Sequence, residues 1–402
     1  MKNLWQKVLI GMILGILCGY IFQEHSIFFK TIATIYTNLI KMIVIPTVFF
    51  AILFGITNIS DIHHLGRIGL KATIIYGIAT ILAITIGIAF TSFLEPGKGV
   101  ILINNYSQDI KILSTLQQNI SDIIINIVPT NFINAMSSGN TLQVVFFAFF
   151  FGLSLILVKE KAHDIKNVII STTHVIFKMV ELVIKTTPYG VFAIMAWIVG
   201  DYGLSLILSL GKLIFVIMAA FTLQYIFFGL MILATKLQPI QFYKKTFNIQ
   251  TLALATSSSK ATITTAIQDL QNKAGVSKRA ASFVLPLGAS VNMTGTAIYI
   301  AACALFFAQV AGIKLTGSQY LILIITSTIG SIGAAGYPGG AVIMLSMVLS
   351  SLGLPIEGIP LILGIDRFID MFRTAINVTG DCAVTVMVDK INKTLDLNKY
   401  NQ

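Results

Sequence analysis

Charged residues are scarce in this sequence. They make up 11% of its 402 residues, against about 25% in an ordinary globular chain. Apolar residues reach 56% and the mean hydropathy is +0.87, so too few polar residues remain to cover a soluble protein of this length. The shortage of charge excludes most soluble classes and predicts an all-α polytopic membrane protein in contact with a lipid bilayer.

Acidic residues and cysteines are also few. The 16 acidic residues stand against 27 basic ones, for a formal net charge of +11. The basic residues are spread between apolar blocks, which argues against a nucleic-acid partner. Cys18, Cys303 and Cys382 stand singly in apolar stretches without a Cys-x-x-Cys pattern. We interpret the cysteines as small core residues and expect no cofactor.

Apolar runs long enough to cross about 30 Å of hydrocarbon recur along the chain. We expect eight transmembrane spans near 5–23, 31–57, 69–93, 141–158, 168–200, 205–235, 280–310 and 357–389. The first is interpreted as a retained helix and not a signal peptide, because no small-residue cleavage site follows it. The loops on the side of the two termini carry most of the Lys and Arg residues, so the positive-inside rule predicts cytoplasmic N- and C-termini.

Two apolar regions are interrupted, and the runs on either side of each interruption are too short to cross a membrane. The region at about 240–274 contains the serine triplet 257–259, and the region at about 317–352 contains the Gly- and Pro-rich segment 336–340. Both are expected to form re-entrant helical hairpins. The free backbone groups at the tips of such hairpins must be buried in protein or line a polar cavity.

An internal repeat accompanies the two hairpins. A helix containing Asn292-Met-Thr-Gly-Thr296 follows the first, and a helix containing Asn377-Val-Thr-Gly-Asp381 follows the second. Paired interrupted segments in corresponding halves indicate a binding site at the membrane midplane of a secondary transporter. The glycine of each copy favours local unwinding, which would free backbone carbonyls to bind cations.

A polar stripe runs along the last expected span. Asp366, Asp370, Arg373, Asn377 and Asp381 are spaced 4, 3, 4 and 4 residues apart, which places them within an arc of roughly 80° on a helix. The other positions of this span are mostly apolar. We therefore expect the stripe to face a protein interior or a water-filled cavity.

The charges of this stripe suggest its chemistry. Four charges at membrane depth represent on the order of 10 kcal/mol that must be compensated, and three carboxylates with one guanidinium leave an excess of negative charge. Bound cations would correct that excess, which indicates ion-coupled transport of an anion. Arg373 suits a carboxylate, Asp370 could bind an ammonium group, and the serine hairpin could bind an α-carboxylate. Asp381, with Asn292 and Asn377, is then left to ligate a cation.

These residues resemble the dicarboxylate/amino acid:cation symporters, the family of glutamate and aspartate transporters, over nearly the whole chain. The resemblance lies in Lys41-Met-Ile-Val-Ile-Pro46, Pro188-Tyr-Gly-Val-Phe-Ala193, the serine triplet, Asn292 to Thr296, Gly336-Tyr-Pro-Gly339, Gly364-Ile-Asp366, Asp370-Met-Phe-Arg373-Thr374 and Asn377 to Asp381. It implies a homotrimer of eight spans and two hairpins with inverted repeats. A fixed scaffold (about 1–60 and 117–200) would hold a transport part (about 65–95 and 205–392) that moves like an elevator.

The resemblance also implies roles for individual residues. The implied substrate-binding residues are Thr256, Ser257, Ser258, Thr296, Tyr337, Ala341, Asp370, Arg373, Thr374 and Asn377. One sodium site would use Gly288, Asn292, Asn377 and Asp381, and a second would use carbonyls of Ser290, Met293, Ser331, Ile332 and Ala334. The second hairpin would be the extracellular gate. Keeping both Asp370 and Arg373 favours acidic amino acids, L-glutamate or L-aspartate, with the choice between them left open.

Several positions depart from the family pattern. Thr294 and Ala79 replace ligands of a third sodium site in archaeal relatives, although Tyr76 and Thr80 remain. Ile300 follows Tyr299 where proton- or potassium-linked relatives often carry a Glu. Coupling to sodium or to protons therefore stays open, with Asp366 as a candidate proton carrier or a charge partner for its polar neighbours.

Other functions are weighed against this expectation. No histidine stands in an apolar hairpin comparable to that of the serine triplet, so a catalytic triad is unfilled. Asp366 and Asp370 lie on one helix beside Arg373, unlike the dyad of an aspartyl protease. We expect no enzyme, and keep a C4-dicarboxylate or neutral amino-acid symporter, or an anion channel, as alternatives. The short link between the third and fourth spans resembles prokaryotic members, which predicts a bacterial inner membrane.

Overall fold

The computed structural model describes residues 4–22, 26–58, 66–99, 125, 127–202, 205–334, 340–354 and 359–402. All regular secondary structure within these ranges is helical. The helices are α1 (Leu4–Ile21), α2 (Ser26–Asn58), α3 (Gly66–Leu94), α6 (Phe132–Ser137), α7 (Thr141–Val158), the 3-10 helix Lys159–Ala162, α8 (His163–Lys185), α9 (Thr187–Tyr202), α10 (Ser205–Ala234), α11 (Pro239–Thr256), α12 (Ser259–Asn272), α13 (Lys278–Val291), α14 (Thr294–Val310), α15 (Gly317–Gly333), α16 (Gly340–Ser351), α17 (Ile359–Ile391) and α18 (Leu397–Asn401).

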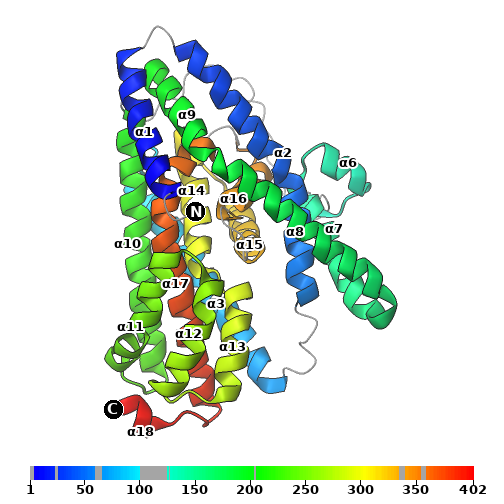
Figure 1. Cartoon of the computed structure of the whole chain (residues 1–402), viewed down its shortest axis with the longest axis vertical. Helices are drawn as coiled ribbons and strands as arrows, with labels where there is room; N and C mark the ends of the chain where they lie inside the picture. Colours follow the sequence, from blue (N-terminus) through cyan, green and yellow to red (C-terminus); the bar gives the residue numbers. More distant parts are fainter. Residues whose placement is uncertain are drawn as a thin grey trace.

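The helices form an elongated bundle with an arm at its side (Figure 1). Helices α3, α10, α11, α13 and α14 pack around α17, which runs along the long axis. Helices α1 and α2 both pack on α9 at one end of the molecule, and α7 and α8 project away from it as the arm. The arrangement leaves α14 and α17 at the centre.

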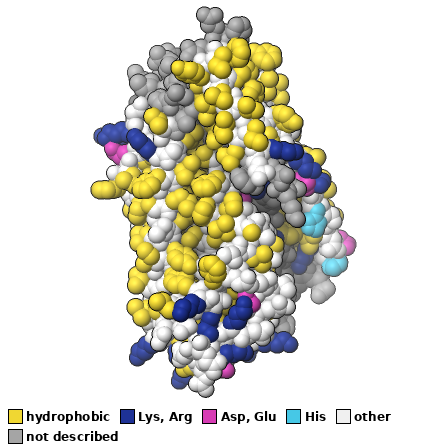
Figure 2. Space-filling model, turned by 60° about the vertical axis from the view of Figure 1, so that its left-hand side comes forward, with side chains coloured by type: hydrophobic (Ala, Val, Ile, Leu, Met, Phe, Trp, Pro, Cys, Tyr) yellow, Lys and Arg dark blue, Asp and Glu magenta, His cyan; other side chains and the backbone are white. Residues whose placement is uncertain are grey.

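The outer face of the bundle is apolar. Along α10, the residues Leu208, Phe215 and Leu230 are 70%, 65% and 56% exposed, although a soluble protein would cover such a row of apolar residues. Figure 2 shows apolar side chains over most of one face, with many Lys and Arg at the lower end and others at the two sides of the upper half. Five helices of the described residues are long and apolar enough to cross a membrane, and three shorter helices are also apolar. These features confirm a polytopic helical membrane protein.

The helices follow the expected spans, except that one span is divided into two helices and one expected helix break is absent. The predicted span 168–200 is divided at Thr186 into α8 and α9, where Pro188, two residues on, lacks the N–H that would continue the hydrogen-bond ladder. The predicted span 280–310 is broken at Asn292 and Met293, as the glycine of its motif suggested. The same expectation is wrong for the second motif, because α17 continues unbroken through Gly380.

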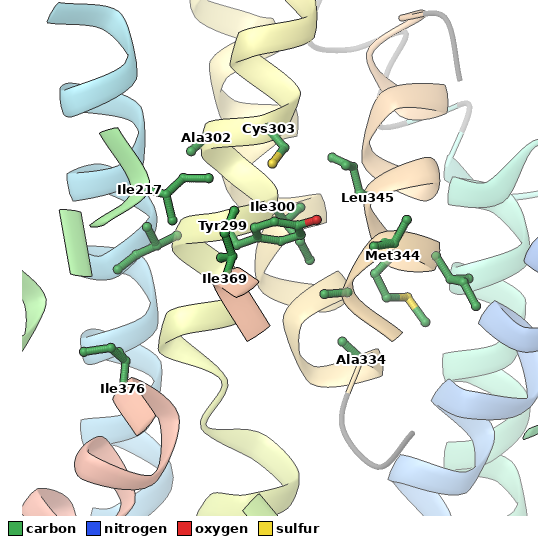
Figure 3. Close-up of a cluster of buried hydrophobic side chains, with 14 of the residues drawn as sticks. Ile217, Tyr299, Ile300, Ala302, Cys303, Ala334, Met344, Leu345, Ile369 and Ile376 are labelled. Atoms are coloured by element: carbon green, nitrogen blue, oxygen red, sulfur yellow. The ribbon is translucent and has the colours of Figure 1, made fainter. Parts of the chain in front are cut away.

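Helix α14 is almost wholly buried. Every residue from Thr294 to Ala308 is inaccessible or nearly so, and its apolar side chains meet those of α16 and α17 (Figure 3). Tyr299 and Ile300 of α14 lie between Ile369 of α17 and Met344 of α16. This close packing fixes the start of α14 against the polar stripe of α17.

Glycines allow α1 to lie directly on the backbone of α9. A Cβ added at Gly11, Gly15 or Gly19 would stand 2.4 Å from a carbonyl oxygen of α9, namely that of Pro188, Phe192 or Ala196. The three glycines are four residues apart, so they occupy one helix face. This small-residue contact is the closest type of packing between membrane helices.

We expect Gly15→Ala to lower the free energy of unfolding by about 1–3 kcal/mol, because the new methyl group overpacks a rigid backbone contact. The measurement is the midpoint of thermal unfolding of the purified protein in detergent. Gly77→Ala is the matched control, since nothing lies within 4 Å of a Cβ at that position of α3. A Gly15→Ala protein as stable as the Gly77→Ala protein would show that α1 is not held by this contact.

Candidate functional site

The break between α13 and α14 is tied to α17 by two asparagines. The backbone N–H of Gly295, in the first turn of α14, donates to Asn377 Oδ1 at 2.8 Å. The side-chain amide of Asn292 donates to Asp381 Oδ1 at 2.8 Å and to the Asn377 carbonyl at 3.3 Å. The first N–H groups of a helix have no acceptor within that helix, and Asn377 of α17 accepts one of those of α14, from Gly295. The two copies of the repeated motif therefore meet in space.

Glycines make this close approach feasible. A Cβ at Gly295 would lie 2.5 Å from the Arg373 carbonyl oxygen, and a Cβ at Gly288 would lie 2.5 Å from both Asp381 Oδ1 and the Tyr76 hydroxyl. A Cβ at Gly380 would stand 2.8 Å from the Asn292 amide nitrogen. The absence of a Cβ at Gly380 therefore leaves room for the Asn292 amide beside α17, which stays helical at this position.

The charged part of the stripe is buried and internally paired. Arg373 donates from Nη1 to Asp366 Oδ1 at 3.0 Å and from Nη2 to Asp370 Oδ1 at 2.5 Å. The side chains of Arg373, Asp366 and Asp370 are only 4%, 5% and 11% exposed. The Arg373 guanidinium also lies over the Tyr299 ring, 4.6 Å from its centroid, which adds a cation–π contact. Asp366 is thus placed as a charge partner of Arg373, while its role as a proton carrier stays a prediction.

A second guanidinium, from Arg367, belongs to the same cluster. Its Nη1 lies 3.4 Å from Asp370 Oδ2. The expected excess of two negative charges was therefore too large, because two arginines balance Asp366 and Asp370. Arg367 was missed because its Cα direction lies about 40° beyond the edge of the stripe, yet its long side chain reaches back.

The remaining uncompensated carboxylate is Asp381. It is 3% exposed, and its hydrogen bond comes from the neutral Asn292 amide. Asn292 Oδ1 and Thr294 Oγ1 are buried without a hydrogen-bond partner among the described residues. Buried polar atoms are normally paired, so these oxygens are open to a ligand. Asp381, with the side-chain oxygen of the adjoining Asn292, is a donor set that suits a hard monovalent or divalent cation.

The neighbouring predicted residues complete this environment. Asn377 Nδ2 donates to Thr296 Oγ1 at 3.3 Å and approaches Met293 Sδ at 3.2 Å. Thr374, one residue from Arg373, is 5% exposed. Ser290, half-buried near the end of α13, donates from its hydroxyl to the Pro286 carbonyl. The structure therefore brings Asn292, Met293 and Thr296 together with Asn377 and Asp381 in one buried region, whereas the hydrogen bond described for Ser290 stays within α13.

The predicted hairpin residues lie at helix ends. Thr256 ends α11, Ser257 has a positive φ of 49°, and Ser258 caps α12 by accepting the Ala261 N–H at 3.3 Å. Ser331 and Ile332 lie in the last turn of α15 and Ala334 directly follows it, with the Ala334 N–H directed at the carbonyls of Gly330 and Ile332. Ala341 is the second residue of α16. Tyr337 lies outside the described residues. The hydrogen bonds described for these residues do not reach Arg373.

Comparison with known proteins identifies the family of this chain. The family model described as the sodium:dicarboxylate symporter family matches residues 4–391. The chain belongs to that family. Its members are membrane symporters, so the sodium:dicarboxylate symporter assignment makes this chain a transporter and not an enzyme.

The similar proteins are named for two classes of substrate, acidic amino acids and C4-dicarboxylates. The chain is 32% identical over 391 residues to a proton/glutamate-aspartate symporter of Bacillus subtilis, covering 96% of this chain and 94% of the relative. It is 32% identical over 396 residues to a proton/sodium-glutamate symport protein of Bacillus caldotenax, covering 96% and 93%. It is 33% identical over 412 residues to a C4-dicarboxylate transport protein of Brucella anthropi, covering 99% and 91%.

Proposed function

We propose that this chain is a secondary active symporter that imports acidic amino acids, L-glutamate or L-aspartate, together with sodium, protons or both. The observation that carries the proposal is the buried pair of Arg373 and Asp370 on one face of α17. A guanidinium and a carboxylate 2.5 Å apart offer complementary partners for the side-chain carboxylate and the ammonium group of one zwitterion. Two of the relatives named for glutamate or aspartate support the same substrate class.

Binding requires this ion pair to open. In the structure Asp370 and Arg373 satisfy each other, so an acidic amino acid would exchange their mutual contact for contacts with its own charges. Such an exchange replaces one buried ion pair by two, so neither residue is left with an uncompensated charge in a low-dielectric interior. Thr296, Thr374 and Asn377 then lie near enough along α14 and α17 to supply polar contacts.

The coupling cation is proposed to bind at Asp381. Carbonyls of Gly288, Asn292 and Asn377 would complete the site, with the unpartnered Asn292 Oδ1 beside it. Ser290, Met293, Ser331, Ile332 and Ala334 form the second proposed site, between the end of α13 and the end of α15. A cation at either place would be held by oxygen ligands in a site closed to water. Sodium is the expected ion, and Asp366 is the candidate proton carrier.

A C4-dicarboxylate is the second candidate substrate. One relative is named for that transport, and Arg367 adds a second guanidinium beside Asp370. A dicarboxylate without an amino group needs no free oxygen on Asp370. The structure therefore offers a specific reason to test both substrate classes.

The whole-molecule arrangement is proposed to be that of an elevator. A homotrimer would hold the scaffold (about 1–60 and 117–200) fixed, while the transport part (about 65–95 and 205–392) carries α14, α17 and both hairpins across the membrane. The Lys and Arg side chains at the end that carries the C-terminus (Figures 1 and 2) support a cytoplasmic C-terminus by the positive-inside rule. The chain is proposed to cross a bacterial inner membrane eight times.

Uptake of labelled L-aspartate, L-glutamate and succinate into proteoliposomes tests this function. We expect accumulation of an acidic amino acid that saturates with concentration and requires an inward sodium gradient or a pH gradient. Sodium alone driving uptake would support the site at Asp381, whereas a pH gradient alone would favour Asp366. Uptake that does not saturate and continues without either gradient would indicate an anion channel, and succinate alone would indicate the second candidate.

A further inference from the structure

Arg367 occupies the carboxylate oxygen of Asp370 that Arg373 leaves open. Arg373 Nη2 contacts Oδ1 at 2.5 Å, and Arg367 Nη1 contacts Oδ2 at 3.4 Å. Both contacts arise within α17, from residues three positions before and three positions after Asp370, which are neighbours along one helix face. Each oxygen of Asp370 is therefore engaged by a cation of the protein itself.

The two contacts differ in how readily they can be given up. The Arg373 side chain is 4% exposed and also bonds Asp366, whereas the Arg367 side chain is 19% exposed. The Arg367 contact is also the longer of the two. A charge that can regain water loses less on separation than one that stays buried, so the contact of Arg367 with Asp370 is the more easily weakened of the two.

An incoming ammonium group and Arg367 compete for the negative charge of Asp370. The ammonium group would take the place of Arg373 at Oδ1 while Arg367 remains at Oδ2, and one buried carboxylate cannot neutralise two cations at full strength. A dicarboxylate without an amino group raises no such competition, because Arg367 can stay where it is. The local charge also differs between the two ligands, because Arg367 remains the sole cationic partner of Asp370 only when a dicarboxylate without an amino group is bound.

We propose that Arg367 is a specificity-determining residue, which acts through Asp370 by competing with the amino group of the substrate and so favours plain C4-dicarboxylates over acidic amino acids. This inference rests on the proposed function, in which Asp370 receives an ammonium group. Arg367 is a positioning residue in this scheme, because it contacts Asp370 and not the transported molecule.

The test compares L-aspartate with succinate, which differ by the amino group alone. Dissociation constants for both are measured on the purified full-length protein by calorimetry in the presence of sodium, at one fixed pH, for the wild type, Arg367→Gln and Arg367→Lys. In Arg367→Gln we expect the affinity for aspartate relative to succinate to rise about fivefold or more, the size expected for losing a partly exposed ionic competitor. In Arg367→Lys, which keeps the cation, the ratio should stay within about twofold of the wild type.

The ratio of the two constants separates this role from a structural one. A misfolded or loosened variant would weaken both ligands together and leave the ratio unchanged, and that result overturns the inference. An equal loss of both affinities in Arg367→Gln with rescue in Arg367→Lys also overturns it, because Arg367 would then bind a carboxylate that the two ligands share. Wild-type protein that binds neither ligand contradicts the proposed function itself, and the inference falls with it.

Discussion

Replacing Arg373 by Met is expected to reduce uptake of acidic amino acids by about 100-fold or more, because truncating one partner of a buried, hydrogen-bonded charge pair costs about 2–5 kcal/mol of binding free energy. The change removes the partner of Asp366 at 3.0 Å and of Asp370 at 2.5 Å. It also removes the planar donor proposed to bind the side-chain carboxylate of the substrate. The measurement is the initial rate of L-aspartate uptake into proteoliposomes, normalised to the amount of protein reconstituted.

Loss of folding must be separated from loss of binding in this experiment. Arg373→Met leaves Asp366 and Asp370 with a single guanidinium, from Arg367, which contacts Asp370 alone. The double variant Arg373→Met with Asp366→Asn removes one of these carboxylates and should recover a monodisperse protein without recovering aspartate uptake. Uptake of aspartate within about threefold of the wild type in either variant would contradict the proposed role of Arg373.

The hairpins and the polar helix could be predicted because their signals are local. Glycine, serine and proline interrupt an apolar run wherever they stand, so α11 with α12 at 239–272 and α15 with α16 at 317–351 match the expected regions within a few residues. The spacing of Asp366, Asp370, Arg373, Asn377 and Asp381 likewise places them on one helix face, and all five are buried. Neither inference needs knowledge of the neighbouring helices.

Arg367 shows that helical spacing alone does not predict every side-chain contact. The angle between two positions follows from 3.6 residues per turn, but a guanidinium lies several bonds from its Cα and can reach a neighbouring turn. The contact of Arg367 with Asp370 depends on which side-chain rotamers the surrounding helices permit. A count of charges on the whole helix, beyond the residues of one stripe, would have revealed that Asp366 and Asp370 are balanced.

The two copies of the Asn-x-Thr-Gly motif show the same limit for the backbone. The helix breaks before Gly295 but continues through Gly380, although the local sequences are alike. Both glycines admit a close neighbour, since a Cβ would lie 2.5 Å from the Arg373 carbonyl oxygen at Gly295 and 2.8 Å from the Asn292 amide nitrogen at Gly380. The break in the first copy is accompanied by a tertiary contact, in which Asn377 Oδ1 of α17 accepts the Gly295 N–H at 2.8 Å. The motif alone therefore does not decide whether the helix breaks.

Asp381→Asn is expected to raise the sodium concentration for half-maximal uptake by more than about 100-fold, because it removes the one carboxylate of the proposed cation site from a buried position. Asparagine keeps an oxygen where Asp381 Oδ1 accepts the Asn292 amide at 2.8 Å, so the junction of α13, α14 and α17 should survive. The measurement is the sodium dependence of aspartate uptake in proteoliposomes, repeated with lithium as a second cation.

The control is Glu181→Gln in α8, where the carboxylate pairs with the exposed Lys178 and Lys185 in the arm, away from the proposed site (Figure 1). Its sodium dependence should remain within about twofold of the wild type. Unaltered sodium dependence in Asp381→Asn would mean that the cation binds elsewhere, and the unpartnered oxygens of Asn292 and Thr294 would then need another ligand. A parallel loss of sodium dependence and of thermal protection by sodium would tie Asp381 to the ion itself, because a merely structural aspartate would weaken the protein equally with and without sodium.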